Sequence, residues 1–208
     1  MKWDFLTADT LPRPPLGVRA IATMAGVGLL TGLVSAIPFP FPEMRLDDAG
    51  LLLNSRGVSL HAGIAFGMGI ALMMWIWVTR DVAECLLALA LTVIGWLAAV
   101  NTASDMFSAV VGSELFGTIE GAKANRELVG LVLAGVSGGA IGAGLTAFGA
   151  GISAEAIRRP KNWVLIVVVG AAAGFLLYPA TDYDALIILF VPWQALVAAT
   201  TAFCLTRL

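Results

Sequence analysis

Charged residues are scarce in this sequence of 208 residues. Only 12% of the residues are Asp, Glu, Lys or Arg, whereas 59% are hydrophobic. A soluble domain carries about a quarter charged residues, so the few charges here cannot cover a water-facing surface. The mean hydropathy of +0.92 agrees with this conclusion. The composition therefore predicts an integral membrane protein.

Residues that bind metals and nucleic acids are also few. The single histidine, His61, excludes a bis-histidine haem or a histidine-rich metal site within this chain. The two cysteines, Cys85 and Cys204, are too few for a structural zinc site on their own. The net charge is −2, with no basic stripe, which argues against a nucleic-acid partner. We expect no cofactor, no metal and no bound nucleic acid.

Six long apolar segments stand out along the chain. They cover residues 18–38, 58–79, 82–101, 127–151, 162–180 and 185–206. Each is close to the roughly 20 residues that cross a hydrocarbon core. Backbone groups inside lipid must bond within their own segment, so these segments should be helices. The pattern predicts one integral membrane domain, 1–208, of the all-α class: a polytopic bundle of about six transmembrane helices.

The distribution of Lys and Arg predicts the orientation of this bundle. The side that holds both termini carries eight of them: Lys2, Arg13, Arg19, Arg80, Arg158, Arg159, Lys161 and Arg207. The opposite side carries four: Arg45, Arg56, Lys123 and Arg126. Since positive residues accumulate in the cytoplasm, both termini should lie inside. The compact size and this bias favour a multi-pass protein of a cell membrane, the inner membrane of a bacterium.

The segment 102–126, between the third and fourth apolar runs, is not an ordinary loop. If it is helical, one face is apolar: Met106, Phe107, Val110 and Val111. Such a face is typical of an interfacial helix or a short re-entrant segment. Continuing that helix would place Glu114 in the middle of the apolar face. A break at Gly112 is therefore favoured, because glycine weakens a helix.

Glycines recur four residues apart on several of the predicted helices. This spacing places two glycines on one face and lets helix backbones approach closely. The predicted packing positions are Gly28, Gly32, Gly63, Gly67, Gly138, Gly142, Gly170 and Gly174. This small-xxx-small pattern favours helix packing, within the chain or between subunits.

Ser137 has a second interpretation, as a nucleophile. The letters "GVSG" at 135–138 fit the Gly-x-Ser-Gly pattern of rhomboid-type intramembrane proteases, but that mechanism needs a histidine base on a later helix. The only histidine, His61, precedes Ser137. An intramembrane hydrolase is therefore the least favoured function, and we expect no enzyme.

Four polar residues are candidates for a polar pathway: Gln194, Ser137, Glu114 and His61. Gln194 follows Pro192, which should kink the last helix, and brings an amide to hydrocarbon depth. The alternative is that Gln194 bonds a neighbouring helix, that Ser137 bonds a backbone carbonyl and that His61 caps a helix at the interface.

Two functions fit these features. The favoured one is a small channel or transporter for a small solute or ion, and the alternative is a non-catalytic membrane subunit or scaffold of a larger complex. The expected partners are membrane lipid and either further copies of the chain or other membrane subunits.

Overall fold

The computed structural model describes residues 14–37, 60–113 and 122–207. Six of its helices are long and apolar enough to cross a membrane. They are Val18–Ala36, Leu60–Val78, Val82–Gly112, Asn125–Gly151, Pro160–Asp182 and Ile187–Leu205. The prediction of a polytopic helical membrane protein is confirmed, and five of the six spans lie within two residues of the predicted ends. The third span is the exception, because it ends eleven residues later than predicted.

Several spans are divided into shorter elements. The helices are α1 (Val18–Ala36), α2 (Leu60–Met73), α3 (Val82–Gly112), α4 (Ala122–Gly151), α5 (Glu155–Arg158), α6 (Pro160–Gly174), α7 (Leu177–Asp182) and α8 (Ile187–Leu205). A π-helical turn, η4 (Met74–Val78), ends the second span, and the fifth span changes direction between α6 and α7.

Lipid-facing side chains on these spans are exposed and apolar, among them Leu30, Met68, Ile94, Phe148, Val168 and Leu196.

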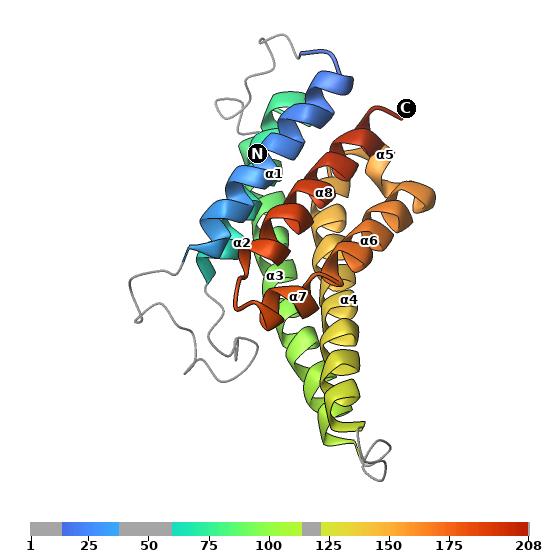
Figure 1. The fold of residues 1–208 in the computed structure, drawn as a ribbon. Helices are drawn as coiled ribbons and strands as arrows, with labels where there is room; N and C mark the ends of the chain where they lie inside the picture. The colour runs from blue at the N-terminus through green and yellow to red at the C-terminus, as the bar shows by residue number, and fades with distance from the viewer. Residues whose placement is uncertain (1–13, 38–59, 114–121, 208) are drawn as a thin grey trace.

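The six spans pack as a ring. The order of neighbours is α1, α2, α3, α4, α6 and α8, and α8 returns to α1. In Figure 1, α1 begins and α8 ends at the upper end, which we call the terminal end. The helices α3 and α4 meet at the opposite end, which we call the hairpin end. By the charge distribution above, the hairpin end is expected to face away from the cytoplasm.

The helices α3 and α4 are longer than a membrane requires. They contain 31 and 30 residues, so each is about 45 Å long, against a hydrocarbon core of about 30 Å. Both project beyond the other helices at the hairpin end (Figure 1). Residues 102–112 continue α3, which ends at Gly112 as the favoured break predicted. Within the described part of 102–126, these residues are therefore an extension of a membrane span rather than a separate interfacial helix.

Local signals explain where the helices begin and end. The carboxylate of Asp81 caps α3 by accepting from the backbone N–H of Ala83 at 2.8 Å. The helix α1 ends at Ala36, and Ile37 is extended, as expected for a residue that precedes a proline. The projecting hairpin is tied together by Arg126, whose guanidinium donates to the carbonyl oxygen of Val111 at 3.1 Å.

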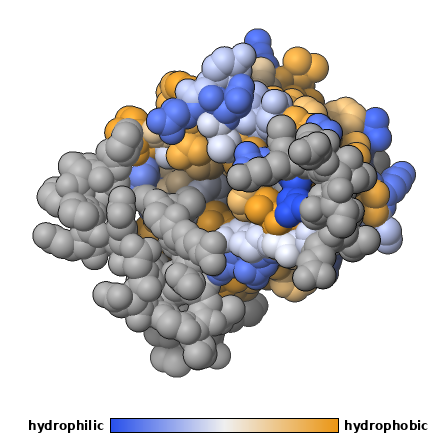
Figure 2. Space-filling model, turned by 60° about the horizontal axis from the view of Figure 1, so that its bottom comes forward, coloured by the Kyte–Doolittle hydropathy of each residue, from blue (hydrophilic) through white to orange (hydrophobic). Residues whose placement is uncertain are grey.

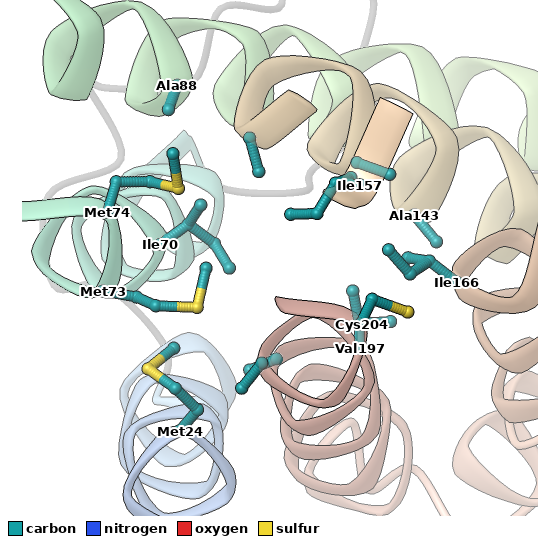
Figure 3. Close-up of a cluster of buried hydrophobic side chains, with 14 of the residues drawn as sticks. Met24, Ile70, Met73, Met74, Ala88, Ala143, Ile157, Ile166, Val197 and Cys204 are labelled. Atoms are coloured by element: carbon teal, nitrogen blue, oxygen red, sulfur yellow. The ribbon is translucent and has the colours of Figure 1, made fainter. Parts of the chain in front are cut away.

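Large side chains fill the ring in its terminal half. Met24, Ile70, Met73 and Val197 have at most 1% of their surface exposed. Figure 3 shows side chains of α1, α2, α4, α6 and α8 converging between the helices there. Three of the core residues are methionines, Met24, Met73 and Met74, whose flexible chains fill irregular gaps. This half of the bundle is therefore closed by a continuous hydrophobic core.

Candidate functional site: an apolar pocket in the hairpin half

A cavity of about 290 Å³ lies in the hairpin half of the ring. Its walls come from α3, α4, the end of α6, α7, and the N-cap and first half of α8. They are formed by Trp96, Ala99, Val100, Ala103, Ser104, Phe107, Leu131, Ala134, Gly135, Gly138, Gly139, Gly174, Leu177, Leu186, Leu189, Phe190 and Trp193. The pocket is partly open, and the filled core of the terminal half closes the bundle beyond it.

The chemistry of these walls is almost wholly apolar. Of the described lining residues, seven are glycine or alanine, and Ser104 supplies their single polar side-chain group besides the indole nitrogens of Trp96 and Trp193. Figure 2 turns the hairpin end forward and shows hydrophobic residues between hydrophilic ones on the described part of this face. Ligand pockets of this size are mostly apolar with few polar groups, so the walls suit an apolar guest.

Aromatic rings form the floor of the pocket. The rings of Trp96 and Phe190 meet edge to face with centroids 5.2 Å apart. Trp193 meets Phe66 in the same way at 5.5 Å. The indole N–H of Trp193 donates to the carbonyl oxygen of Gly170 at 3.0 Å, which fixes this ring between α8 and α6. The edge-to-face contacts stabilise the floor beyond the burial of the rings themselves.

Two of the predicted glycines make room for this floor. A Cβ added at Gly63 would lie 2.9 Å from side-chain atoms of Trp96. One added at Gly142 would lie 3.2 Å from the ring of Trp193. Each glycine therefore lets a bulky indole lie flat against a neighbouring helix.

The other predicted glycines lie where helix backbones meet. On α1, added Cβ atoms at Gly28 and Gly32 would approach backbone atoms of α8 to 2.5 and 2.6 Å. At Gly67 the nearest atom is the carbonyl oxygen of Leu89, at 3.1 Å, and at Gly138 it is that of Ala99, at 2.8 Å. All these contacts lie inside the chain, which gives the glycines a role without any partner protein.

The closest of these contacts involves two glycines of α4 that are not among the predicted packing positions. Gly135 and Gly139 of α4 face Gly174 and Gly170 of α6, and a Cβ at either α4 position would overlap the facing carbonyl oxygen. Gly135 and Gly139 are also four residues apart, so the same spacing could have identified them. Because this face of α4 carries no side chains, the pocket beside the contact between α4 and α6 is left unfilled.

Gln194 is buried completely, but it does not line the pocket. Its amide nitrogen donates to the hydroxyl of Ser35 on α1 at 2.8 Å, and its oxygen Oε1 is buried without a partner among the described residues. Ser35 in turn donates to the carbonyl oxygen of Thr31 at 2.7 Å. On the neighbouring α2, Nε2 of His61 lies 3.2 Å from the carbonyl oxygen of Val34. Two of the four candidate polar residues therefore lie near one another, where α1, α2 and α8 meet.

The other two candidates do not join this group. The hydroxyl of Ser137 donates to the carbonyl oxygen of Ala134 one turn earlier at 3.1 Å, so its proton is used within its own helix. Glu114 lies outside the described residues. The three candidates that the structure describes, Gln194, His61 and Ser137, thus form no continuous row along the ring.

Metal chemistry and known relatives give no further assignment. Among the described residues, no group of three or more His, Cys, Asp or Glu side chains is placed to hold a metal ion. The chain matches no protein-family model, no curated protein and no solved structure. The pocket and its surroundings are therefore the features that bear on function.

Proposed function

We propose that this membrane protein is a carrier that binds a small apolar molecule in the pocket of its hairpin half. The observation that carries the proposal is a partly open cavity with apolar walls, beside a packed hydrophobic core that fills the other half of the bundle. A binding site that is accessible from one side at a time is the arrangement that a carrier needs.

An open channel for ions is less well supported. An ion inside the membrane needs polar or charged groups to replace its water. The pocket offers one hydroxyl and two indole N–H groups, one of which is already bonded. In the terminal half, the packed core of Met24, Ile70 and Val197 leaves the axis filled.

Binding of a fluorescent apolar probe tests this proposal. The probe N-phenyl-1-naphthylamine gains fluorescence in apolar surroundings, so it should bind the purified protein in a saturable manner. Val100 lines the pocket, and Val100→Phe should fill it and abolish saturable binding. Ile94→Phe, which adds the same ring to a lipid-facing position of α3, is the matched control and should bind as the original protein does. Equal binding by both variants would reject the pocket as the site.

A second function, as a subunit of a larger membrane complex, is supported by the projection of α3 and α4. About 15 Å of each helix lies beyond what a 30 Å core can cover. Met106 on the projecting part of α3 is 36% exposed. A photo-crosslinking residue at position 106 should then capture one other chain in native membranes, while the same residue at position 94 should not. Capture of lipid alone at position 106 would count against this function.

A further inference from the structure

We infer that the guest of the pocket is a single hydrocarbon chain that lies parallel to the helices with its end on the aromatic floor. This inference deepens the proposed function and depends on it, because it names the chemical class of the apolar molecule. A hydrocarbon chain of this kind is part of a membrane phospholipid or of a free fatty acid.

The dimensions of the pocket favour a chain. Along α3 the lining residues run from Trp96 to Phe107, a rise over eleven residue steps of about 16 Å. From the N-cap of α8 they run from Leu186 to Trp193, a rise over seven residue steps of about 10 Å. One leaflet of the hydrocarbon core is about 15 Å thick, half of the full core. The pocket is therefore a slot about as long as one leaflet is deep, and its outer end, at Phe107, lies on the part of α3 that extends beyond a core of about 30 Å.

The depth of the floor agrees with this length. Trp193 lies twelve residues before Leu205 at the terminal end of α8. A rise of 1.5 Å per residue places Trp193 about 18 Å from that end, and thus about 12 Å below the hairpin-side surface of a 30 Å core. A chain that enters from the hairpin-side leaflet would reach the floor without crossing the middle of the membrane.

The walls also favour a flexible chain over a rigid ring system. Six of the wall residues on α3 and α4 are glycine or alanine: Ala99, Ala103, Ala134, Gly135, Gly138 and Gly139. Such a surface is smooth along the helix axes, so a hydrocarbon chain makes van der Waals contact with it over the whole length of the chain. Near the floor, the indole N–H of Trp193 is already bonded to Gly170, which leaves the indole N–H of Trp96 as a single donor among the described lining residues of the floor, so a polar head group should stay at the mouth.

The two tryptophans of the floor supply a direct test. Trp96 and Trp193 are 9% and 6% exposed, so lipid outside the bundle reaches them poorly. The other four tryptophans, Trp3, Trp75, Trp77 and Trp163, would be replaced by phenylalanine. The full chain would then be reconstituted in phosphatidylcholine vesicles whose acyl chains carry bromine near the methyl end, because bromine quenches indole fluorescence at short range.

The expected result is strong quenching of the floor tryptophans by chain-brominated phosphatidylcholine. Adding Val100→Phe should remove most of this quenching, and adding Ile94→Phe should leave it unchanged. If Val100→Phe does not fold, Ser104→Phe blocks the same slot nearer its mouth. A brominated free fatty acid in unlabelled vesicles distinguishes the two sources, because it quenches in place of the phospholipid if the guest is a free acid.

Two other outcomes separate the inference from the proposed function. If neither brominated chain quenches but N-phenyl-1-naphthylamine still binds in a manner that Val100→Phe abolishes, the guest is a compact apolar molecule and the chain is rejected. If neither the chains nor the probe respond to Val100→Phe, both the chain and the carrier are rejected. Quenching that is equal in the Val100→Phe and Ile94→Phe variants would likewise overturn the inference, since it would arise from bulk lipid.

Discussion

The terminal half of the bundle is filled by side chains, whereas the hairpin half keeps a cavity of about 290 Å³ between α3, α4, α7 and α8. The two halves differ in the size of the residues that point inward. Methionine, isoleucine and valine occupy the first, as with Met24, Ile70 and Val197. Glycine and alanine occupy much of the second, as with Gly138, Gly139 and Ala103. Helices that pack closely at small residues can therefore still enclose a cavity.

This difference shows how one ring can be both stable and open. Membrane helices associate by close packing, because the lipid around them is as apolar as their own side chains. The contact between α4 and α6 obtains its stability from backbone approach at Gly135 and Gly139 rather than from interdigitated side chains. Its side toward the ring axis is then free of bulk and available to a guest.

Truncating one large side chain in each half tests this comparison most strongly. Ile70 is fully buried in the terminal half, so Ile70→Ala should lower the free energy of unfolding by about 2–5 kcal/mol, the usual range for a core cavity. Leu186 lines the mouth of the pocket and is 47% exposed. Leu186→Ala leaves little new cavity and should lower the free energy of unfolding by less than about 1 kcal/mol. Unfolding in mixed detergent micelles measures both, and equal losses would contradict the distinction between the halves.

A matched pair of glycines on α4 sharpens the comparison at the level of the backbone. Gly139→Ala places a methyl group against the carbonyl oxygen of Gly170, so α4 and α6 must separate, and we expect a loss of about 1–3 kcal/mol. At Gly144 the nearest atom to an added Cβ belongs to the Trp163 ring at 3.4 Å, an ordinary contact.

Gly144→Ala is therefore the control for that pair. It should be neutral or stabilising by up to about 1 kcal/mol, because alanine is the better helix former. The difference in thermal unfolding between the two variants is the measurement. A tolerated Gly139→Ala would mean that the contact between α4 and α6 is looser than the structure has it.

The positions of the spans could be predicted from the sequence because hydropathy acts over a whole segment. The third span was predicted too short for a physical reason. Polar residues such as Asn101, Ser104 and Asp105 end the apolar run there. The backbone nevertheless stays helical to Gly112, because this extension packs against α4, with Phe107 and Val111 facing Gly130. Hydropathy marks where lipid ends, not where a helix ends.

The pocket could not be predicted, because it depends on which helices become neighbours. Trp96 and Trp193 are far apart in the sequence, and only the ring order of α3, α4, α6 and α8 brings them to one floor. The spacing of glycines was visible, but it does not say which faces meet. Likewise, the neighbours Trp193 and Gln194 point to different places, because successive residues in a helix are about 100° apart.

Gln194 is the residue on which the comparison makes its smallest prediction. Gln194→Leu removes one hydrogen bond to Ser35, worth about 0.6 kcal/mol between membrane helices. It also removes the buried oxygen Oε1, which has no partner among the described residues, and leaving such a group unpaired costs about 1–3 kcal/mol. Ser35 keeps its bond to the carbonyl oxygen of Thr31. We therefore expect Gln194→Leu to change the free energy of unfolding by no more than about 1 kcal/mol.

The same variant should bind N-phenyl-1-naphthylamine as the original protein does, because Gln194 faces α1 and not the pocket. Gln194→Ala serves as the control for volume, since it leaves a hole where leucine does not and should cost about 2 kcal/mol or more. A loss above about 2 kcal/mol in Gln194→Leu would show that Oε1 is satisfied in the membrane, for example by a buried water. The junction of α1, α2 and α8 would then be a hydrated polar site, and the candidate pathway through Gln194 and His61 would regain support over the apolar pocket.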